Sequence, residues 1–132
     1  MHGPHLMLDC YECDKEKLND LNLVYKLLDE LPSEIGMHKM TLPYVVTWDG
    51  GKTSNDPGGI SGFVMIAESH VSIHTFPDQG YFTMDLYSCK DFDKEFVVEY
   101  VKNLFGAKRI EQEFVHRGKL FRKLVAQKAL NR

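Results

Sequence analysis

Hydrophobic and polar positions alternate over residues 5–11 and then change to helical spacing. Apolar residues at every second position from Leu6 to Cys10 predict a first strand with at least one buried face. Asp14 is a suitable N-cap residue, and Pro32 is expected to end the segment that follows. An amphipathic helix is predicted there because apolar side chains recur at helical spacing, at Leu18, Leu21, Val24, Tyr25, Leu28 and Leu31.

The next segment is rich in β-branched and aromatic residues from Met37 to Trp48, which predicts a second strand. Pro43 indicates an edge position or a bulge in it, because proline donates no backbone hydrogen bond. Residues 49–59 form the longest run of turn-forming residues in the chain. This loop is either a mobile flap beside a site or a plain connection between strands.

The second half of the chain continues with short strand-like runs joined by brief turns. Three successive runs predict an antiparallel meander, over Ile60–Ala67, Val71–Phe76 and Tyr81–Tyr87. A second helix is expected between the N-cap Asp93 and the C-terminal Gly106. A last strand over 109–116 and a basic amphipathic helix or frayed tail over 119–131 complete the pattern.

These elements fit a single domain of 132 residues. Strands outnumber helices, and the two main helices lie between groups of strands. We therefore expect an α+β fold, a two-layer sandwich with a mostly antiparallel sheet and two main helices on one face. The opposite face would need a cover, which favours a homodimer formed by sheet stacking or edge pairing.

Composition narrows the class of protein further. A formal charge of -3 gives no electrostatic reason to expect nucleic acid as a partner. The chain contains no apolar run of the ~20 residues that would span a bilayer, and its first residues do not resemble a signal peptide. Three cysteines argue against a disulfide framework, so we expect a cytoplasmic protein. Cys10 and Cys13 form one isolated Cys-x-x-Cys pair, interpreted as one core residue and one partly exposed residue.

Chemically versatile residues are concentrated between Glu68 and Cys89. Ser69 follows an acid, and His70 and His74 lie within the next five positions. A serine hydrolase is a weak interpretation, because no Gly-x-Ser-x-Gly elbow surrounds Ser69. A metal site is not expected, since histidines four residues apart on a strand are about 13 Å apart.

This segment resembles the self-processing region of prokaryotic S-adenosylmethionine decarboxylases. The resemblance is carried by Glu68-Ser69-His70, Ile73-His74-Thr75, Gly80-Tyr81 and Cys89, within an organisation similar from about His5 to Gly118. These enzymes make their pyruvoyl group from their own serine and use neither PLP nor a metal. The resemblance implies cleavage between Glu68 and Ser69 into a β chain, 1–68, and an α chain, 69–132. A homodimer of processed αβ protomers would follow.

The resemblance also assigns roles to individual residues. The Ser69 hydroxyl would attack the Glu68 carbonyl, and elimination from the resulting ester would lead to a pyruvoyl group with loss of ammonia. Ser61 and His74 match the residues that assist processing, and Cys89 matches the catalytic acid. The parity of a strand would point Ser69 and His74 to opposite faces, so a bend or bulge near Ser69 is required. A ketone can form a Schiff base with a substrate amine and accept the electrons that decarboxylation releases.

Substrate recognition departs from the family pattern at two positions. Asn55 stands where the family has an aromatic residue that stacks on adenine, and Asp78 stands where an acid holds the ribose hydroxyls. Trp48, Phe76 or Phe82 would have to supply the missing ring. The resemblance thus implies decarboxylation of S-adenosylmethionine for spermidine synthesis. Decarboxylation of arginine or ornithine through the same group, and an unprocessed regulatory homologue, remain alternatives.

Overall fold

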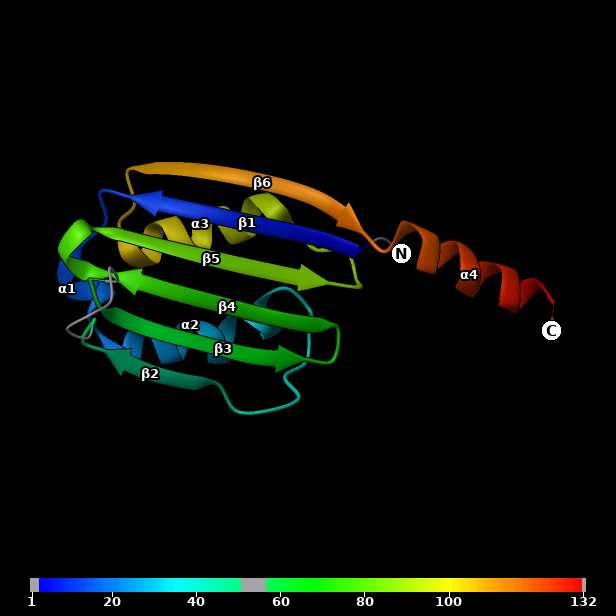
Figure 1. The fold of residues 1–132 in the computed structure, drawn as a ribbon, viewed down its shortest axis with the longest axis horizontal. Helices are drawn as coiled ribbons and strands as arrows, with labels where there is room; N and C mark the ends of the chain where they lie inside the picture. Colours follow the sequence, from blue (N-terminus) through cyan, green and yellow to red (C-terminus); the bar gives the residue numbers. More distant parts are fainter. Residues whose placement is uncertain (1–2, 51–56, 132) are drawn as a thin grey trace.

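A six-stranded antiparallel sheet forms the centre of the molecule. The structure is a computed structural model, and it describes residues 3–50 and 57–131. The strands lie in the order β2-β3-β4-β5-β1-β6, and β3, β4 and β5 form the predicted meander (Figure 1). Their bounds are β1 Gly3–Tyr11, β2 Tyr44–Trp48, β3 Gly59–Ile66, β4 Ser69–Phe76, β5 Tyr81–Ser88 and β6 Arg109–Arg117.

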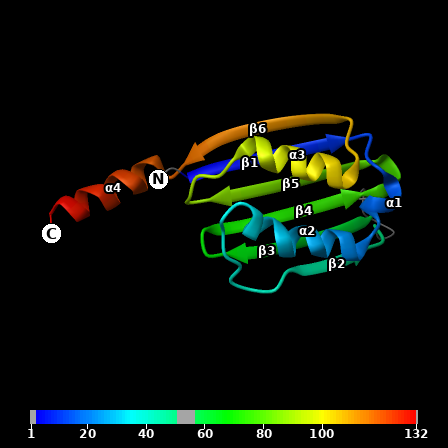
Figure 2. The ribbon, with the colours of Figure 1, turned by 180° about the vertical axis from the view of Figure 1, so that it is seen from behind.

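The two long helices cover one face of this sheet, as Figure 2 shows. They are α2 (Leu21–Glu34) and α3 (Lys94–Phe105). A single helical turn, α1 (Lys15–Leu18), precedes α2, and the 3₁₀ turn η1 (Pro77–Gln79) joins β4 to β5. The last helix, α4 (Lys119–Leu130), projects beyond the end of the sheet. The predicted α+β sandwich with two main helices on one face is confirmed.

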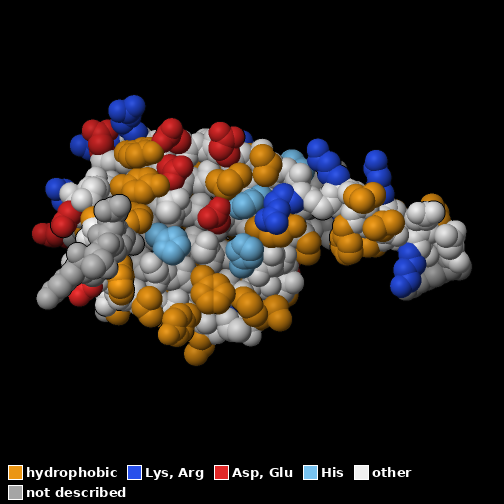
Figure 3. All heavy atoms as spheres, in the orientation of Figure 1, with side chains coloured by type: hydrophobic (Ala, Val, Ile, Leu, Met, Phe, Trp, Pro, Cys, Tyr) orange, Lys and Arg blue, Asp and Glu red, His pale blue; other side chains and the backbone are white. Residues whose placement is uncertain are grey.

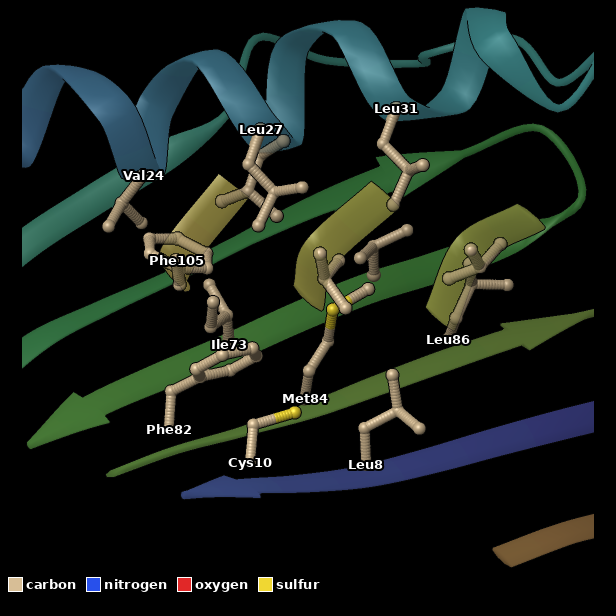
Figure 4. Packing of buried hydrophobic residues seen from close by; sticks show 14 of the residues in the cluster. Leu8, Cys10, Val24, Leu27, Leu31, Ile73, Phe82, Met84, Leu86 and Phe105 are labelled. Atoms are coloured by element: carbon tan, nitrogen blue, oxygen red, sulfur yellow. The ribbon is translucent and has the colours of Figure 1, made fainter. Parts of the chain in front are cut away.

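The core lies between the sheet and these helices, and strand alternation decides which residues enter it. Every second residue of β1, β4 and β5 is buried on the helix side. Leu27 and Leu31 of α2 reach down toward Met84 and Leu86 of β5 (Figure 4). The Phe82 and Phe105 rings lie 4.8 Å apart at their centroids and tie β5 to α3.

Three sequence predictions about element bounds were wrong. The expected single helix from Asp14 is broken after Leu18, because Asp20 provides a second N-cap whose carboxylate accepts the Leu23 N–H. Pro32 does not end the helix, since a missing N–H one turn from the C-terminus removes only one intrahelical bond. Similarly, the predicted second strand is confined to Tyr44–Trp48, after Pro43, although Lys39 forms an isolated bridge to Ile66.

The face of the sheet opposite α2 and α3, called here the open face, carries mixed side chains (Figure 3). Apolar side chains gather over β2 and β3, where all five large ones are at least 40% exposed: Tyr44, Val46, Trp48, Phe63 and Met65. Acidic side chains gather over β1 and β6. An exposed apolar patch of this kind indicates an interaction surface.

The cysteines differ from the expectation in one respect. Cys10 and Cys13 are both buried, whereas one of them was expected to be partly exposed. Burial raises the pKa of Cys10 to about 12 and that of Cys13 to about 11, so both thiols stay protonated. Cys89 is exposed, and all three cysteines are free thiols.

Candidate active site

The Glu68-Ser69 junction lies in the tight turn between β3 and β4. Ile66 and Ser69 pair across this hairpin, which leaves Ala67 and Glu68 as its two loop residues. Two-residue hairpin loops favour positive φ at their central residues, yet here the positive φ, 159°, falls on Ser69 instead. No bulge interrupts the register of β4 with β3 or β5. The bulge expected near Ser69 is therefore not present in the pairing of β4.

A backbone donor is aimed at the Glu68 carbonyl. The N–H of Cys89 donates to this oxygen at 2.8 Å, because β5 ends beside the β3–β4 turn. The carbonyl is the one that the Ser69 hydroxyl would attack, and its oxygen becomes negative during such an attack. A fixed N–H at this distance stabilises that charge, as in an oxyanion hole. Sequence reasoning missed this contact, because it considered only the Cys89 thiol.

The Glu68 side chain is held away from the junction. Its Oε1 accepts the backbone N–H of His38 at 3.1 Å, and its Oε2 lies 3.3 Å from His38 Nδ1. The backbone hydrogen bond from His38, with help from the ring, lowers the pKa of Glu68 below its ordinary value. The carboxylate thus anchors the residue that precedes the junction.

His70 lies beside the Ser69 hydroxyl, with its Nδ1 3.4 Å from Ser69 Oγ. Burial lowers the pKa of His70, and the neighbouring His5 adds to this effect. The ring also lies against Tyr87, at 5.8 Å between centroids. A neutral imidazole beside a hydroxyl can accept its proton. From the sequence, His70 was considered only for a hydrolase or a metal site, not for processing.

Ser61 and His74 lie together, but not beside Ser69. Their strands pair at this position, and Ser61 Oγ lies 2.8 Å from His74 Nδ1 on the open face. They line a shallow hollow of about 160 Å³ with Tyr44, Val46, Phe63 and Ser72. Five residues of β4 separate His74 from Ser69, which corresponds to roughly 16 Å along the strand. Within one chain, this pair is too far from Ser69 to assist its reaction.

Asp78 lies farther still from Ser69, at the opposite end of β4. It lines a hollow of about 200 Å³ with Trp48 and the segment 57–59. Gly59 is required here, since a Cβ on it would lie 1.8 Å from the Thr75 carbonyl oxygen. Asn55, the other predicted substrate-binding residue, lies outside the described residues.

The three aromatic candidates for ring stacking are now distinguishable. Phe82 is fully buried in the core and cannot contact a substrate. Phe76 is stacked on Tyr81, with centroids 5.4 Å apart. Trp48 is half exposed and lies in the Asp78 hollow, so it is the ring best positioned for a ligand there.

The candidate residues therefore form two groups at two ends of the sheet. One group consists of Glu68, Ser69 and Cys89, and the other of Ser61, His74 and Asp78.

Within the described ranges, 3–50 and 57–131, no three His, Cys, Asp or Glu side chains gather as a metal site would require. No helix in those same ranges is long and apolar enough to cross a membrane.

Comparison with known proteins shows which family the chain belongs to. The family model of S-adenosylmethionine decarboxylase matches residues 4–118. The S-adenosylmethionine decarboxylase proenzyme of Thermotoga petrophila is 35% identical over 124 residues, which cover 89% of this chain and 85% of that protein. The proenzyme of Geobacillus kaustophilus is 31% identical over 123 residues, with 88% and 87% covered.

A solved structure agrees with these sequence matches. The crystal structure of the adenosylmethionine decarboxylase of Aquifex aeolicus superimposes with a TM-score of 0.73 at 28% identity, and covers 88% of this chain and 90% of that one. The chain belongs to the S-adenosylmethionine decarboxylase family, the pyruvoyl-dependent carboxy-lyases that the sequence resembled.

Proposed function

We propose that this protein is a pyruvoyl-dependent S-adenosylmethionine decarboxylase that activates itself by cleavage between Glu68 and Ser69. The observation that carries the proposal is the hydrogen bond from the Cys89 N–H to the Glu68 carbonyl oxygen. It polarises the one peptide carbonyl that the serine must attack, at the tight turn between β3 and β4.

Cleavage begins at the Ser69 hydroxyl. His70 accepts its proton, because burial keeps the pKa of this imidazole low and the ring therefore neutral. The oxygen bonds to the Glu68 carbonyl carbon while the Cys89 N–H holds the developing negative charge. When the bond between this carbon and the Ser69 nitrogen breaks, that nitrogen takes up a proton and an ester replaces the peptide. In the dimer described below, His74 of the partner subunit removes the Ser69 α-proton as the Glu68 carboxylate leaves, and the partner's Ser61 orients it.

The dehydroalanine that remains at residue 69 tautomerises to an imine, and water hydrolyses this imine with release of ammonia. The products are a β chain, 1–68, and an α chain, 69–132, that begins with the pyruvoyl group. The residues at the junction fit such a group, since Ser69 supplies its carbon atoms. After cleavage β4 would begin at residue 69, and its pairing with β3 and β5 would be kept. The pyruvoyl carbonyl supplies the electron sink that decarboxylation next to an amine needs. Cys89, which is exposed and adjacent to the junction, returns a proton to the product carbon.

A homodimer completes the site in this proposal. A second copy stacked on the open face, and turned end for end, would bring its Ser61–His74 pair and its Asp78–Trp48 hollow over Ser69 and Cys89. The exposed apolar side chains over β2 and β3 support such an interface. In this arrangement Asp78, together with Asn55, contributes to substrate binding from the partner.

Mixed dimers test this arrangement. Coexpressed Ser69→Ala and His74→Ala chains would form a heterodimer in which one site retains both an intact Ser69 and an intact His74. Cleavage of the His74→Ala chain should then be restored in the mixture and absent when this chain is alone. Equal cleavage in both samples would contradict the shared site.

Release of labelled carbon dioxide tests the substrate. The family match and its relatives favour S-adenosylmethionine over arginine or ornithine. We expect carboxyl-labelled S-adenosylmethionine to lose its label, and labelled arginine and ornithine to keep theirs. The opposite pattern would refute the proposed substrate. We also propose that the enzyme acts in the cytoplasm, which its three free thiols support.

A further inference from the structure

Helix α4 is an addition to the domain that the family shares. The family model ends at residue 118, and α4 begins at Lys119, after a left-handed Gly118. Figures 1 and 2 show this helix projecting beyond the end of the sheet, away from α2 and α3. Its large apolar side chains are strongly exposed, at 70% for Leu120, 67% for Phe121 and 55% for Leu124. A helix that exposes these side chains needs a surface to cover them.

Charge is divided unequally between this arm and the rest of the chain. All 19 acidic residues lie in residues 1–118, together with 11 of the 16 basic ones, so this part carries a formal charge of about -8. Residues 119–132 contain the other five basic residues and no acid. Two such arms would repel each other, and the acidic body would be repelled by an anionic bilayer. The complementary surface is the body of another copy.

The end-for-end dimer proposed above determines which part of the partner the arm meets. The arm leaves the sheet where β6 ends, at Arg117. In a copy turned end for end, the start of β6 and the end of β1 lie there instead. That end has a hollow of about 560 Å³, lined by Tyr11, Glu12, Gln79, Arg109, Ile110 and Glu111. Figure 3 shows the apolar side chains of α4 on the side that faces the same way as the open face.

We propose that α4 is a dimerisation arm that docks in this hollow on a second copy of the chain. Phe121 and Leu124 contact Tyr11 and Ile110, and the lysines of the arm pair with Glu12 and Glu111. The proposal rests on the end-for-end dimer of the proposed function, and it adds a second contact outside the sheet interface.

Charge reversal in the full-length protein tests the arm. Lys123→Glu with Lys128→Glu should weaken dimerisation roughly tenfold or more in sedimentation equilibrium, since like charges would then face each other. Adding Glu12→Lys and Glu111→Lys to that variant should restore dimerisation. Lys26→Glu is the matched control, because Lys26 is exposed on α2, away from both surfaces, and its reversal should leave dimerisation unchanged.

Carbodiimide cross-linking of mixed ¹⁴N and ¹⁵N chains distinguishes contacts between copies from contacts within one. Links from arm lysines to Glu12 or Glu111 should carry both isotopes. Three results would each overturn the proposal. They are cross-links that join only chains of the same isotope, a wild-type protein that is monomeric, and a charge-reversed variant that dimerises as well as the wild type. So would binding to phosphatidylglycerol vesicles by the wild-type protein with no effect of the arm on dimerisation. Cleavage and carbon dioxide release are measured on the same samples. If the wild-type protein neither cleaves nor releases carbon dioxide, but charge reversal in the arm still weakens dimerisation, only the proposed function is refuted.

Discussion

Replacing Cys89 by proline removes a backbone donor that no side-chain substitution can reach. The Cys89 N–H is 2.8 Å from the Glu68 carbonyl oxygen, and proline has no N–H to donate. Cys89→Ala removes the thiol and keeps this N–H. The pair of variants therefore separates the two functions of one residue, activation of the carbonyl in the precursor and proton donation in the mature enzyme.

The size of the effect follows from the geometry. Loss of one donor to a developing oxyanion slows a reaction by about 10²–10³-fold, or roughly 3–4 kcal/mol of activation free energy. Cleavage of the Cys89→Pro precursor should slow by this factor. Cys89→Ala should cleave at nearly the wild-type rate but turn over substrate poorly, since its product carbon lacks the thiol proton.

Cell-free translation followed by a chase gives the cleavage rate directly. The full-length chain and the two fragments are separated by gel or by intact mass, and circular dichroism of purified protein confirms that both variants fold. If Cys89→Pro cleaves as fast as Cys89→Ala while both are folded, the backbone donor has no part in the reaction.

Four further substitutions probe the same account. Ser69→Ala should give a folded, uncut and inactive chain, whose single mass is read by mass spectrometry; any fragment pair would contradict this. His74→Ala should slow elimination and accumulate the ester, detected as hydroxylamine-sensitive chain, whereas a stable peptide bond would exclude this role. Phe82→Ala should lower the free energy of unfolding by about 3–5 kcal/mol in a urea titration, because it empties a buried site; a loss below 1 kcal/mol would contradict the packing. The lowered pKa of Glu68 implies that its contact with His38 stabilises the fold fully above the ordinary pKa of 4.5 and that this contribution disappears as the pH falls through the lowered value. Melting temperatures of uncut protein with and without Glu68→Gln should thus differ at pH 7 and converge in acid, and a constant difference would refute this.

Local signals in the sequence were sufficient for most of the fold. Alternation in β4 and β5 and helical spacing in α3 each reflect burial on one side, which the sequence encodes directly. The break before α2 was missed because Asp20 is one polar residue among several, and only its hydrogen bond to Leu23 reveals a cap. The paired segment of the second strand was overestimated, since apolar composition does not show where a partner strand ends.

The site was predicted as a set of residues but not as an arrangement. Motif resemblance proposed Ser69, His74 and Cys89 as site residues, and the structure places Ser69 at the β3–β4 hairpin and His74 beside Ser61 on the open face. The contact of the Cys89 N–H with Glu68 was out of reach, because it depends on where β5 ends beside the hairpin. The separation of His74 from Ser69 follows from their spacing on one strand. What a second copy contributes to the site was hidden, because it does not show in the sequence of one chain.

Intact mass of the purified protein under denaturing, non-reducing conditions tests the central claim most directly. The account predicts two polypeptides, residues 1–68 and 69–132, and an α chain whose first residue has lost its amino group and resists Edman degradation. One full-length chain with an unbroken Glu68-Ser69 bond, after long incubation, would contradict it.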